Sequence, residues 1–121
     1  MSIPQLSLQR LSPRQSLIPH QEQALQVLRA YGVEQVQLFG SAARGEMTDE
    51  SDIDLLITMP AGQSLSAFRR VGLKLELERV IGRPVDVLDH INPVFEPYIR
   101  PDLVSLPLRK SLYIRSQKFG I

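Results

Sequence analysis

Apolar residues recur with helical spacing in the first third of the chain. From Ala24 to Tyr31 they occupy positions i, i+3, i+4 and i+7, with Gln and Arg between them. Pro19 precedes this pattern and Gly32 follows it, and both residue types are typical of helix ends. An amphipathic helix is therefore expected between these two residues.

Two later segments are rich in apolar and β-branched residues and predict strands. The first covers residues 33–39 and stops at Gly40, and the second covers residues 52–58. Between them, residues 41–45 are small and predict a tight turn or a single helical turn, and residues 46–51 predict a polar loop.

A second helix is expected over residues 65–81, with Ser64 as its N-cap. Gly82 and Pro84 follow as stop signals. The stripe along this helix is imperfect but helical in period, and its positions are Leu65, Phe68, Val71, Leu75 and Glu78.

The remaining elements are short. Residues 85–88 predict a third strand, residues 95–100 a helical turn, and residues 108–115 a strand or short helix. The order helix, strand, turn, strand, helix, strand predicts an α+β fold, a small mixed β-sheet with helices packed on one face. Residues 1–19, with three prolines, predict an N-terminal arm, and residues 20–121 predict one folded domain.

Composition agrees with one globular domain and narrows the function. The 121 residues are 43% apolar and 22% charged, as in soluble globular proteins. The formal net charge of +1 provides no general attraction for nucleic acid. The chain has no cysteine, which excludes disulfides and thiolate chemistry. No segment has the apolar length of a membrane span or a secretory signal, so a cytoplasmic location is expected.

Acidic residues in two of the expected strands are the main chemical signal. Asp52 and Asp54 point to the same side of an extended strand, about 6.5 Å apart, while Ile53 can face the core. Asp86 lies between Val85 and Val87 in the same way. Buried unpaired carboxylates cost several kcal/mol, so a positive partner is expected. Mg²⁺ fits, because it prefers carboxylate, water and phosphate oxygens.

The turn after the first expected strand is suited to phosphate. Gly40 allows close approach of the backbone, the Ser41 hydroxyl can donate a hydrogen bond, and Arg44 can form a charged fork. The segment lacks the glycines and lysine of the Walker A and dinucleotide-binding loops.

Structural explanations compete with each of these interpretations. Asp52 and Asp54 could cap the start of a strand and form surface salt bridges, and Asp86 could be solvated on an edge strand. Ser41 could be an ordinary helix cap. No spacing predicts a hydrolytic triad. Both histidines are isolated and are expected to be structural or exposed: His20 and His90.

Taken together, "FGSAARGEMTDESDIDLLI" and "GRPVDVLD" resemble a known family. Gly-Ser, ten intervening residues and Asp-x-Asp match the signature of the DNA polymerase beta-like nucleotidyltransferases, and the fuller strings resemble the minimal nucleotidyltransferase (MNT) branch. The resemblance covers roughly residues 20–115.

The resemblance implies a role for each matching position. Gly40 and Ser41 would hold the nucleotide triphosphate, and Arg44 would touch phosphate. Asp52 and Asp54 would ligate two Mg²⁺ ions. Asp86 would complete the metal site and help to deprotonate the attacking hydroxyl.

Many MNT proteins are antitoxins encoded beside a HEPN-domain ribonuclease toxin. The resemblance therefore implies transfer of AMP from ATP to a tyrosine hydroxyl of that toxin. Two alternatives stay open: inhibition by binding and masking the toxin, and transfer to a small-molecule or RNA acceptor. Masking would use exposed basic and aromatic residues, for which the candidates are Arg69, Arg70, Lys74, Phe95, Tyr98 and Tyr113.

Overall fold

The computed structural model describes residues 16–108. Its helices and strands follow the expected order, with a short helix where a tight turn or single helical turn is expected at residues 41–45, and with a fourth strand as an addition. In chain order they are α2 (Gln21–Ala30), β1 (Gln35–Phe39), α3 (Gly40–Arg44), β2 (Ile53–Thr58), α4 (Ala67–Ile81), β3 (Val85–Leu88), α5 (Glu96–Ile99), η1 (Arg100–Asp102, a 3-10 turn) and β4 (Val104–Ser105).

The strands form one mixed sheet in the order β3-β2-β1-β4. β1 runs antiparallel to both β2 and β4, whereas β2 and β3 are parallel. A parallel pair needs a crossover connection, and α4 provides it. The predicted α+β class and mixed sheet are confirmed.

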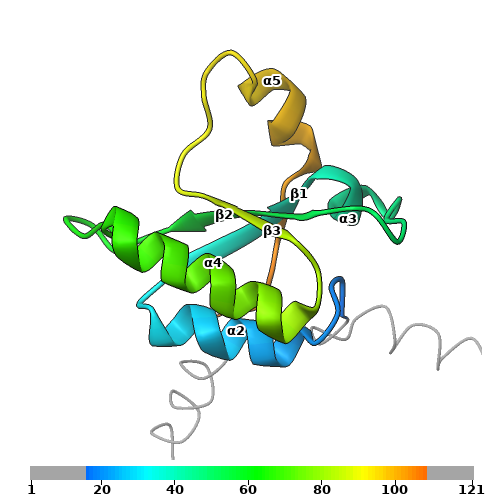
Figure 1. Cartoon of the computed structure of the whole chain (residues 1–121). Helices are drawn as coiled ribbons and strands as arrows, with labels where there is room; N and C mark the ends of the chain where they lie inside the picture. The colour runs from blue at the N-terminus through cyan, green and yellow to red at the C-terminus, as the bar shows by residue number, and fades with distance from the viewer. Residues whose placement is uncertain (1–15, 109–121) are drawn as a thin grey trace, which may run out of the picture.

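Helices α2 and α4 lie side by side and cover one face of the sheet, while α5 lies on the opposite side (Figure 1). Strand side chains alternate, so every second residue of β1, β2 and β3 points into the layer beneath the helices. The fully buried side chains of this layer are Leu25, Leu28, Val36, Leu38, Ile53, Leu55, Ile57, Leu73, Leu77 and Val85.

Helix α2 agrees with its sequence pattern. It begins after His20, ends before Tyr31, and buries Ala24, Leu25 and Leu28. Ile18, in the segment predicted to be an arm, is 3% exposed and belongs to the core. The rest of that arm, residues 1–15, lies outside the described residues, so the division at residue 19 stays a prediction.

The predicted start of α4 is wrong by two residues. Its N-cap is Ser66, whose Oγ accepts a hydrogen bond of 3.1 Å from the Arg69 amide. Ser64 stands before the buried Leu65 instead. Both serines are residues that suit an N-cap. Leu65 is buried before the helix starts, so the helix begins after Ser66.

The stripe predicted along α4 is not the face that packs against the sheet. The helix buries Leu73, Leu77 and Ile81. Three residues of the predicted stripe face solvent instead: Phe68 is 87% exposed, Val71 54% and Leu75 57%. The helix carries two apolar stripes, and its own periodicity cannot tell which of them meets the sheet.

The C-terminal elements are short, as expected. β3 and the helical turn α5 match the predictions for residues 85–88 and 95–100. β4 was missed, because a two-residue strand leaves no periodic signal. The element predicted over residues 108–115 lies, beyond Leu108, outside the described residues. Within residues 16–108 no helix has the length and apolar character needed to cross a bilayer.

Candidate active site

Asp54 and Asp86 lie next to each other on the face of the sheet that α2 and α4 do not cover. They are register partners on the parallel strands β2 and β3. On either side of Asp54, Ile53 and Leu55 are fully buried, so strand alternation directs Asp54 to the opposite face. Asp54 is half-buried and Asp86 is exposed on the edge strand. Asp86 is therefore solvent-exposed on an edge strand and also lies beside Asp54, with which it shares a side-chain hydrogen bond.

Asp52 lies just before β2 and is exposed. Its negative charge acts on Asp54, as does that of Asp86. Among residues 16–108, however, no group of three or more His, Cys, Asp or Glu side chains is close enough to hold a metal ion. The structure thus brings Asp54 and Asp86 together and leaves Asp52 at the margin of the pair.

The environment of Asp54 disfavours its charged form. Partial burial, the negative charges of Asp86 and Asp52, and a side-chain hydrogen bond with Asp86 raise the pKa of Asp54 to about 6, against the opposing effect of Arg44. No Lys or Arg among the described residues forms an ion pair with these three carboxylates. The surface salt-bridge interpretation of Asp52 and Asp54 is therefore not supported within residues 16–108. A bound cation would relieve this unbalanced charge.

The Gly-Ser turn lies against the same carboxylate. Phe39, the last residue of β1, is the register partner of Asp54, so the chain turns away beside it. Gly40 has φ of +77°, and a Cβ added there would lie 2.3 Å from Asp54 Oδ2. Only glycine permits both this backbone conformation and this close approach. The structure therefore brings the predicted phosphate-binding turn and the predicted metal ligand together.

Ser41 is the second residue of α3 and is partly buried. The residue at the N-cap of α3 is Phe39, with extended backbone and no capping hydrogen bond from its side chain. The alternative reading of Ser41 as an ordinary helix cap is therefore wrong.

Arg44 ends α3 and is held by two carboxylates. Its Nε lies 3.0 Å from Glu46 Oε1, and one terminal nitrogen lies 2.8 Å from Asp102 Oδ2. These bonds raise the pKa of Arg44 above its usual value. Asp102 belongs to η1, so this ion pair connects the turn after β1 to the C-terminal segment. The contact spans 58 residues, and nothing in the local sequence predicts it.

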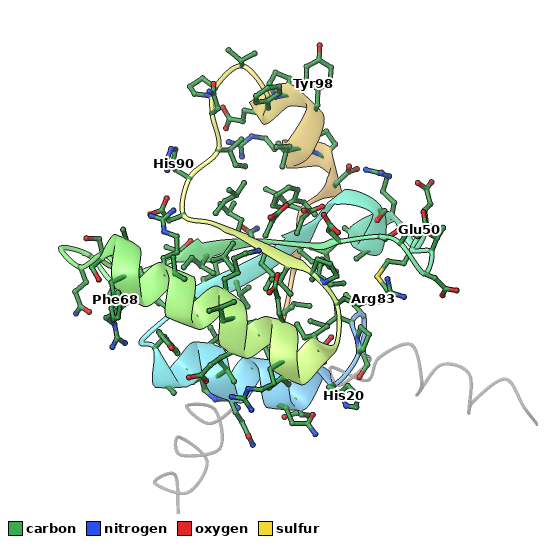
Figure 2. All side chains as sticks on the ribbon, in the orientation of Figure 1. His20, Glu50, Phe68, Arg83, His90 and Tyr98 are labelled. Carbon is green, nitrogen blue, oxygen red and sulfur yellow. The ribbon has the colours of Figure 1, made fainter. Side chains whose placement is uncertain are left out.

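Arg83 holds the polar loop that leads into Asp52, and sequence reasoning missed it. One of its terminal nitrogens donates to the carbonyl oxygens of Thr48 at 2.6 Å and Ser51 at 3.0 Å. Figure 2 shows Arg83 just after α4, on the same side of the molecule as the loop that carries Glu50. The Arg83 side chain thus connects the segments that lead into β2 and β3, in addition to the backbone pairing of these two strands.

The histidines and most of the basic helix residues have structural explanations. His20 is exposed, and His90 is exposed with Nδ1 2.7 Å from Asp89 Oδ1, as expected. In Figure 2 both rings lie at the periphery of the molecule. Arg70 pairs with Asp89 at 2.6 Å, and Arg69 lies 4.8 Å from the centre of the Tyr31 ring.

Comparison with known proteins identifies the family. The model of the nucleotidyltransferase domain family matches residues 21–117. The chain belongs to this family. The matched range contains every residue of the Gly-Ser and carboxylate motif, so the resemblance seen in the sequence is confirmed.

Two relatives make the relationship more specific. One is a Methanocaldococcus jannaschii protein whose name gives protein adenylyltransferase as its provisional function. It is 40% identical over 82 residues, which are 66% of this chain and 86% of the relative. The other is the protein adenylyltransferase MntA of Thermococcus cleftensis, 30% identical over 84 residues, which cover 69% of this chain and 77% of that protein.

Solved structures confirm the fold of this nucleotidyltransferase. A structure described provisionally as a minimal nucleotidyltransferase has a TM-score of 0.57 at 28% identity and covers 74% of this chain and 98% of its own. A toxin–antitoxin crystal structure with AMP-PNP gives 0.62 at 18% identity, covering 82% and 89%. A tri-AMPylated Shewanella oneidensis HEPN toxin in complex with its MNT antitoxin gives 0.56 at 16% identity, covering 84% and 87%.

Proposed function

We propose that this nucleotidyltransferase is an antitoxin that transfers AMP from ATP to a tyrosine hydroxyl of a cognate HEPN ribonuclease toxin. Its relatives are named protein adenylyltransferases, and among its structural neighbours is an MNT antitoxin in complex with an AMPylated HEPN toxin. Modification of the toxin would block its cleavage of RNA.

The observation that carries this proposal is the position of Gly40 against Asp54, with Asp86 as the register partner of Asp54. A backbone turn suited to phosphate and two neighbouring carboxylates are the parts that nucleotidyl transfer requires. Both lie on the sheet face that the large helices leave open.

The donor set fits Mg²⁺. This ion commonly takes one or two carboxylates and completes its shell with phosphate oxygens and water. Asp54 and Asp86 supply two carboxylates without a competing Lys or Arg ion pair among the described residues, and Asp52 would add a third. When bound, Mg²⁺ would neutralise charge on the triphosphate and lower the pKa of the attacking hydroxyl.

The residues of the chain then have distinct roles. Gly40 and Ser41 bind and orient the triphosphate, and Arg44 contributes a guanidinium once its bonds to Glu46 and Asp102 are exchanged for phosphate. Asp86 accepts the proton of the tyrosine hydroxyl. The tyrosine oxygen bonds to the α-phosphorus, and the bond from that phosphorus to the bridging oxygen breaks. Pyrophosphate leaves with the electron pair.

The test combines the purified chain with its cognate HEPN-domain toxin, identified by complex formation with this chain, ATP and Mg²⁺. We expect the toxin to gain the mass of one or more AMP units, with label retained from the α-phosphate of ATP and lost from the γ-phosphate. A toxin that forms the complex but keeps its original mass would contradict the proposal.

The matched control is Asp54→Asn, which preserves side-chain volume and removes the charge. We expect the rate of AMP transfer to fall by about 10³-fold or more, since the variant loses a residue that acts directly on the reacting groups. Complex formation should persist, because Asp54 lies in the site and not on an apolar surface.

A second candidate function is inhibition by masking alone. Phe68, Val71 and Leu75 form an exposed apolar stripe on α4, and Phe95 and Tyr98 are 56% and 77% exposed. Figure 2 shows Phe68 and Tyr98 directed away from the body of the protein. If a variant with both Asp52→Asn and Asp54→Asn still protects cells from the toxin, masking is sufficient.

Transfer to another acceptor is the remaining alternative. The net charge of +1 gives little general attraction for RNA. In the same labelling experiment, α-phosphate label on RNA or on a small molecule, with none on the toxin, would favour this alternative.

A further inference from the structure

Two side chains of α4 bind the backbone of β3 one residue before Asp86. Lys74 Nζ donates to the Val85 carbonyl oxygen at 2.6 Å, and the Val85 amide donates to Glu78 Oε2 at 3.0 Å. Lys74 also donates to the same Glu78 oxygen at 2.9 Å. We call these two side chains, one helical turn apart, the Lys74–Glu78 clamp.

The clamp binds backbone groups on the outer edge of β3, where a further strand would otherwise pair. β3 is at the edge of the sheet, and β2 lies on its other side. The Ile53 amide bonds to the Pro84 carbonyl at 2.9 Å, so the backbone groups of the following residue, Val85, point to the open edge. Unpaired backbone groups at an edge favour fraying or pairing with another chain, and the clamp satisfies both groups of Val85.

The clamp is held in place by its own charge interactions. The hydrogen bond from the Val85 amide, followed by that from Lys74, lowers the pKa of Glu78. The Glu78 side chain is 27% exposed and that of Lys74 40%, so neither is free in solvent. A flexible surface ion pair contributes little, whereas this pair makes two hydrogen bonds from a helix to a strand and a third between its own side chains.

From this geometry we infer that the Lys74–Glu78 clamp positions Asp86 for binding of the divalent cation with the nucleotide. The Val85 side chain is fully buried, and the clamp fixes the peptide groups on both sides of its Cα. Asp86 follows directly and is exposed, so its position depends on the backbone of β3 and on its hydrogen bond with Asp54 more than on packing of its side chain. Groups behind a metal ligand set its orientation and affect metal affinity strongly. This inference rests on the proposed function.

The experiment uses the full chain, Mn²⁺ as a paramagnetic substitute for Mg²⁺, and the non-reactive nucleotide α,β-methylene-ATP. Mn²⁺ affinity is measured by electron paramagnetic resonance in the presence of the nucleotide. Amide hydrogen exchange at Val85 is measured by NMR without metal or nucleotide. No acceptor protein is needed.

Glu78→Ala removes the acceptor for both the Val85 amide and Lys74. We expect faster exchange at Val85 and Mn²⁺ affinity weakened about tenfold. Glu78→Gln keeps an oxygen acceptor and should restore affinity to within about twofold of the unmodified chain. Lys74→Met keeps the aliphatic stem and removes only the donor, so a smaller loss in the same direction is expected even if Glu78→Ala folds poorly.

The matched control is Glu76→Ala on the same helix. It removes the 3.3 Å hydrogen bond from the Tyr31 hydroxyl but does not touch β3. It should leave both Val85 exchange and Mn²⁺ affinity within about twofold of the unmodified chain. If the clamp had a purely structural role, Glu78→Ala would lower the free energy of unfolding without a selective loss of Mn²⁺ affinity.

The outcomes separate the two proposals. Unchanged Mn²⁺ affinity in Glu78→Ala, or unchanged Val85 exchange, overturns the positioning role while the proposed function stands. If the unmodified chain itself fails to bind Mn²⁺ and nucleotide, the proposed function falls, and with it the role of the clamp in that function.

Discussion

The two faces of β2 contrast the buried core of the protein with the surface of the candidate site. Ile53, Leu55 and Ile57 point beneath α2 and α4 and are at most 1% exposed. Asp54, between the first two, points to the other face and meets Asp86. The residues alternate along six positions, but their surroundings are opposite: apolar and sealed on one face, acidic and open on the other.

This difference shows where the free energy of folding comes from and where it is lost. Burial of apolar side chains on the covered face stabilises the fold, by roughly 1.5–3 kcal/mol for each large side chain. On the open face, mutual repulsion of the carboxylates opposes folding. The strand can hold the acidic pair in place because its other face is anchored.

The largest expected effect comes from the covered face. Leu55→Ala should lower the free energy of unfolding by about 2–5 kcal/mol, because it leaves a cavity in the packed layer. Leu56→Ala, on the open face of the same strand and only partly buried, should cost clearly less. Urea unfolding followed by circular dichroism measures both, and equal losses would contradict the assignment of the faces.

The next effect tests the close approach of the Gly-Ser turn. Gly40 and Gly45 both have positive φ, +77° and +74°, so alanine is strained at either position, by about 1–2 kcal/mol. A Cβ at Gly45 meets nothing within 4 Å, whereas a Cβ at Gly40 meets Asp54 Oδ2. Gly40→Ala should therefore displace the carboxylate in addition.

The two alanine variants are compared by Mn²⁺ affinity in the presence of α,β-methylene-ATP. Gly40→Ala should lose most of that affinity, and Gly45→Ala should retain it. Loss of affinity in both variants would mean that backbone strain, and not the contact with Asp54, explains the effect.

The pKa of Asp54 predicts an effect of about 1–2 kcal/mol that depends on pH. The pKa of about 6 in the folded state lies above the ordinary value of 3.8 for an aspartate, so the folded state binds more protons between these pH values. Stability should therefore fall as pH rises from about 4 to about 6 and stay lowered above that. Solvent screens part of the repulsion because Asp54 is only half-buried, so the effect on stability is smaller than the change in pKa alone would give.

Asp54→Asn should remove the loss of stability that the charged Asp54 carboxylate causes above about pH 6. In the presence of EDTA, we expect the variant to be about 1–2 kcal/mol more stable than the unmodified chain at pH 8, with little difference at pH 4. Urea unfolding at the two pH values measures it, with the exposed loop variant Asp49→Asn as a control for removal of one negative charge. A destabilised Asp54→Asn at pH 8 would refute the repulsion.

Sequence reasoning succeeded where the pattern is local. The period of two along residues 53–57 predicts which side chains are buried. The Gly-Ser and Asp-x-Asp spacing identifies the family and predicts that Gly40 and Asp54 lie close together. It failed where the outcome depends on distant partners. The ion pair of Arg44 with Asp102, the hydrogen bonds of Arg83 to the loop and the Lys74–Glu78 clamp join segments that no local rule connects.

The inner face of α4 is the clearest case of this limit. Leu73 and Leu77 repeat at i and i+4, and Val71 and Leu75 repeat with the same spacing two residues earlier. Both stripes have helical period, so hydrophobicity along the helix does not distinguish them. Packing against β3 and α2 decides, and only the tertiary structure contains that information.

The smallest expected effect tests this assignment of α4. Leu75→Ser, on the outer stripe at 57% exposure, should change the free energy of unfolding by no more than about 0.5 kcal/mol. Leu73→Ala, two residues away and fully buried, should cost about 2–5 kcal/mol by the cavity that it leaves. Thermal and urea unfolding of the two variants side by side give the difference. Similar losses would place both stripes in the core and remove the exposed surface on which inhibition by masking depends.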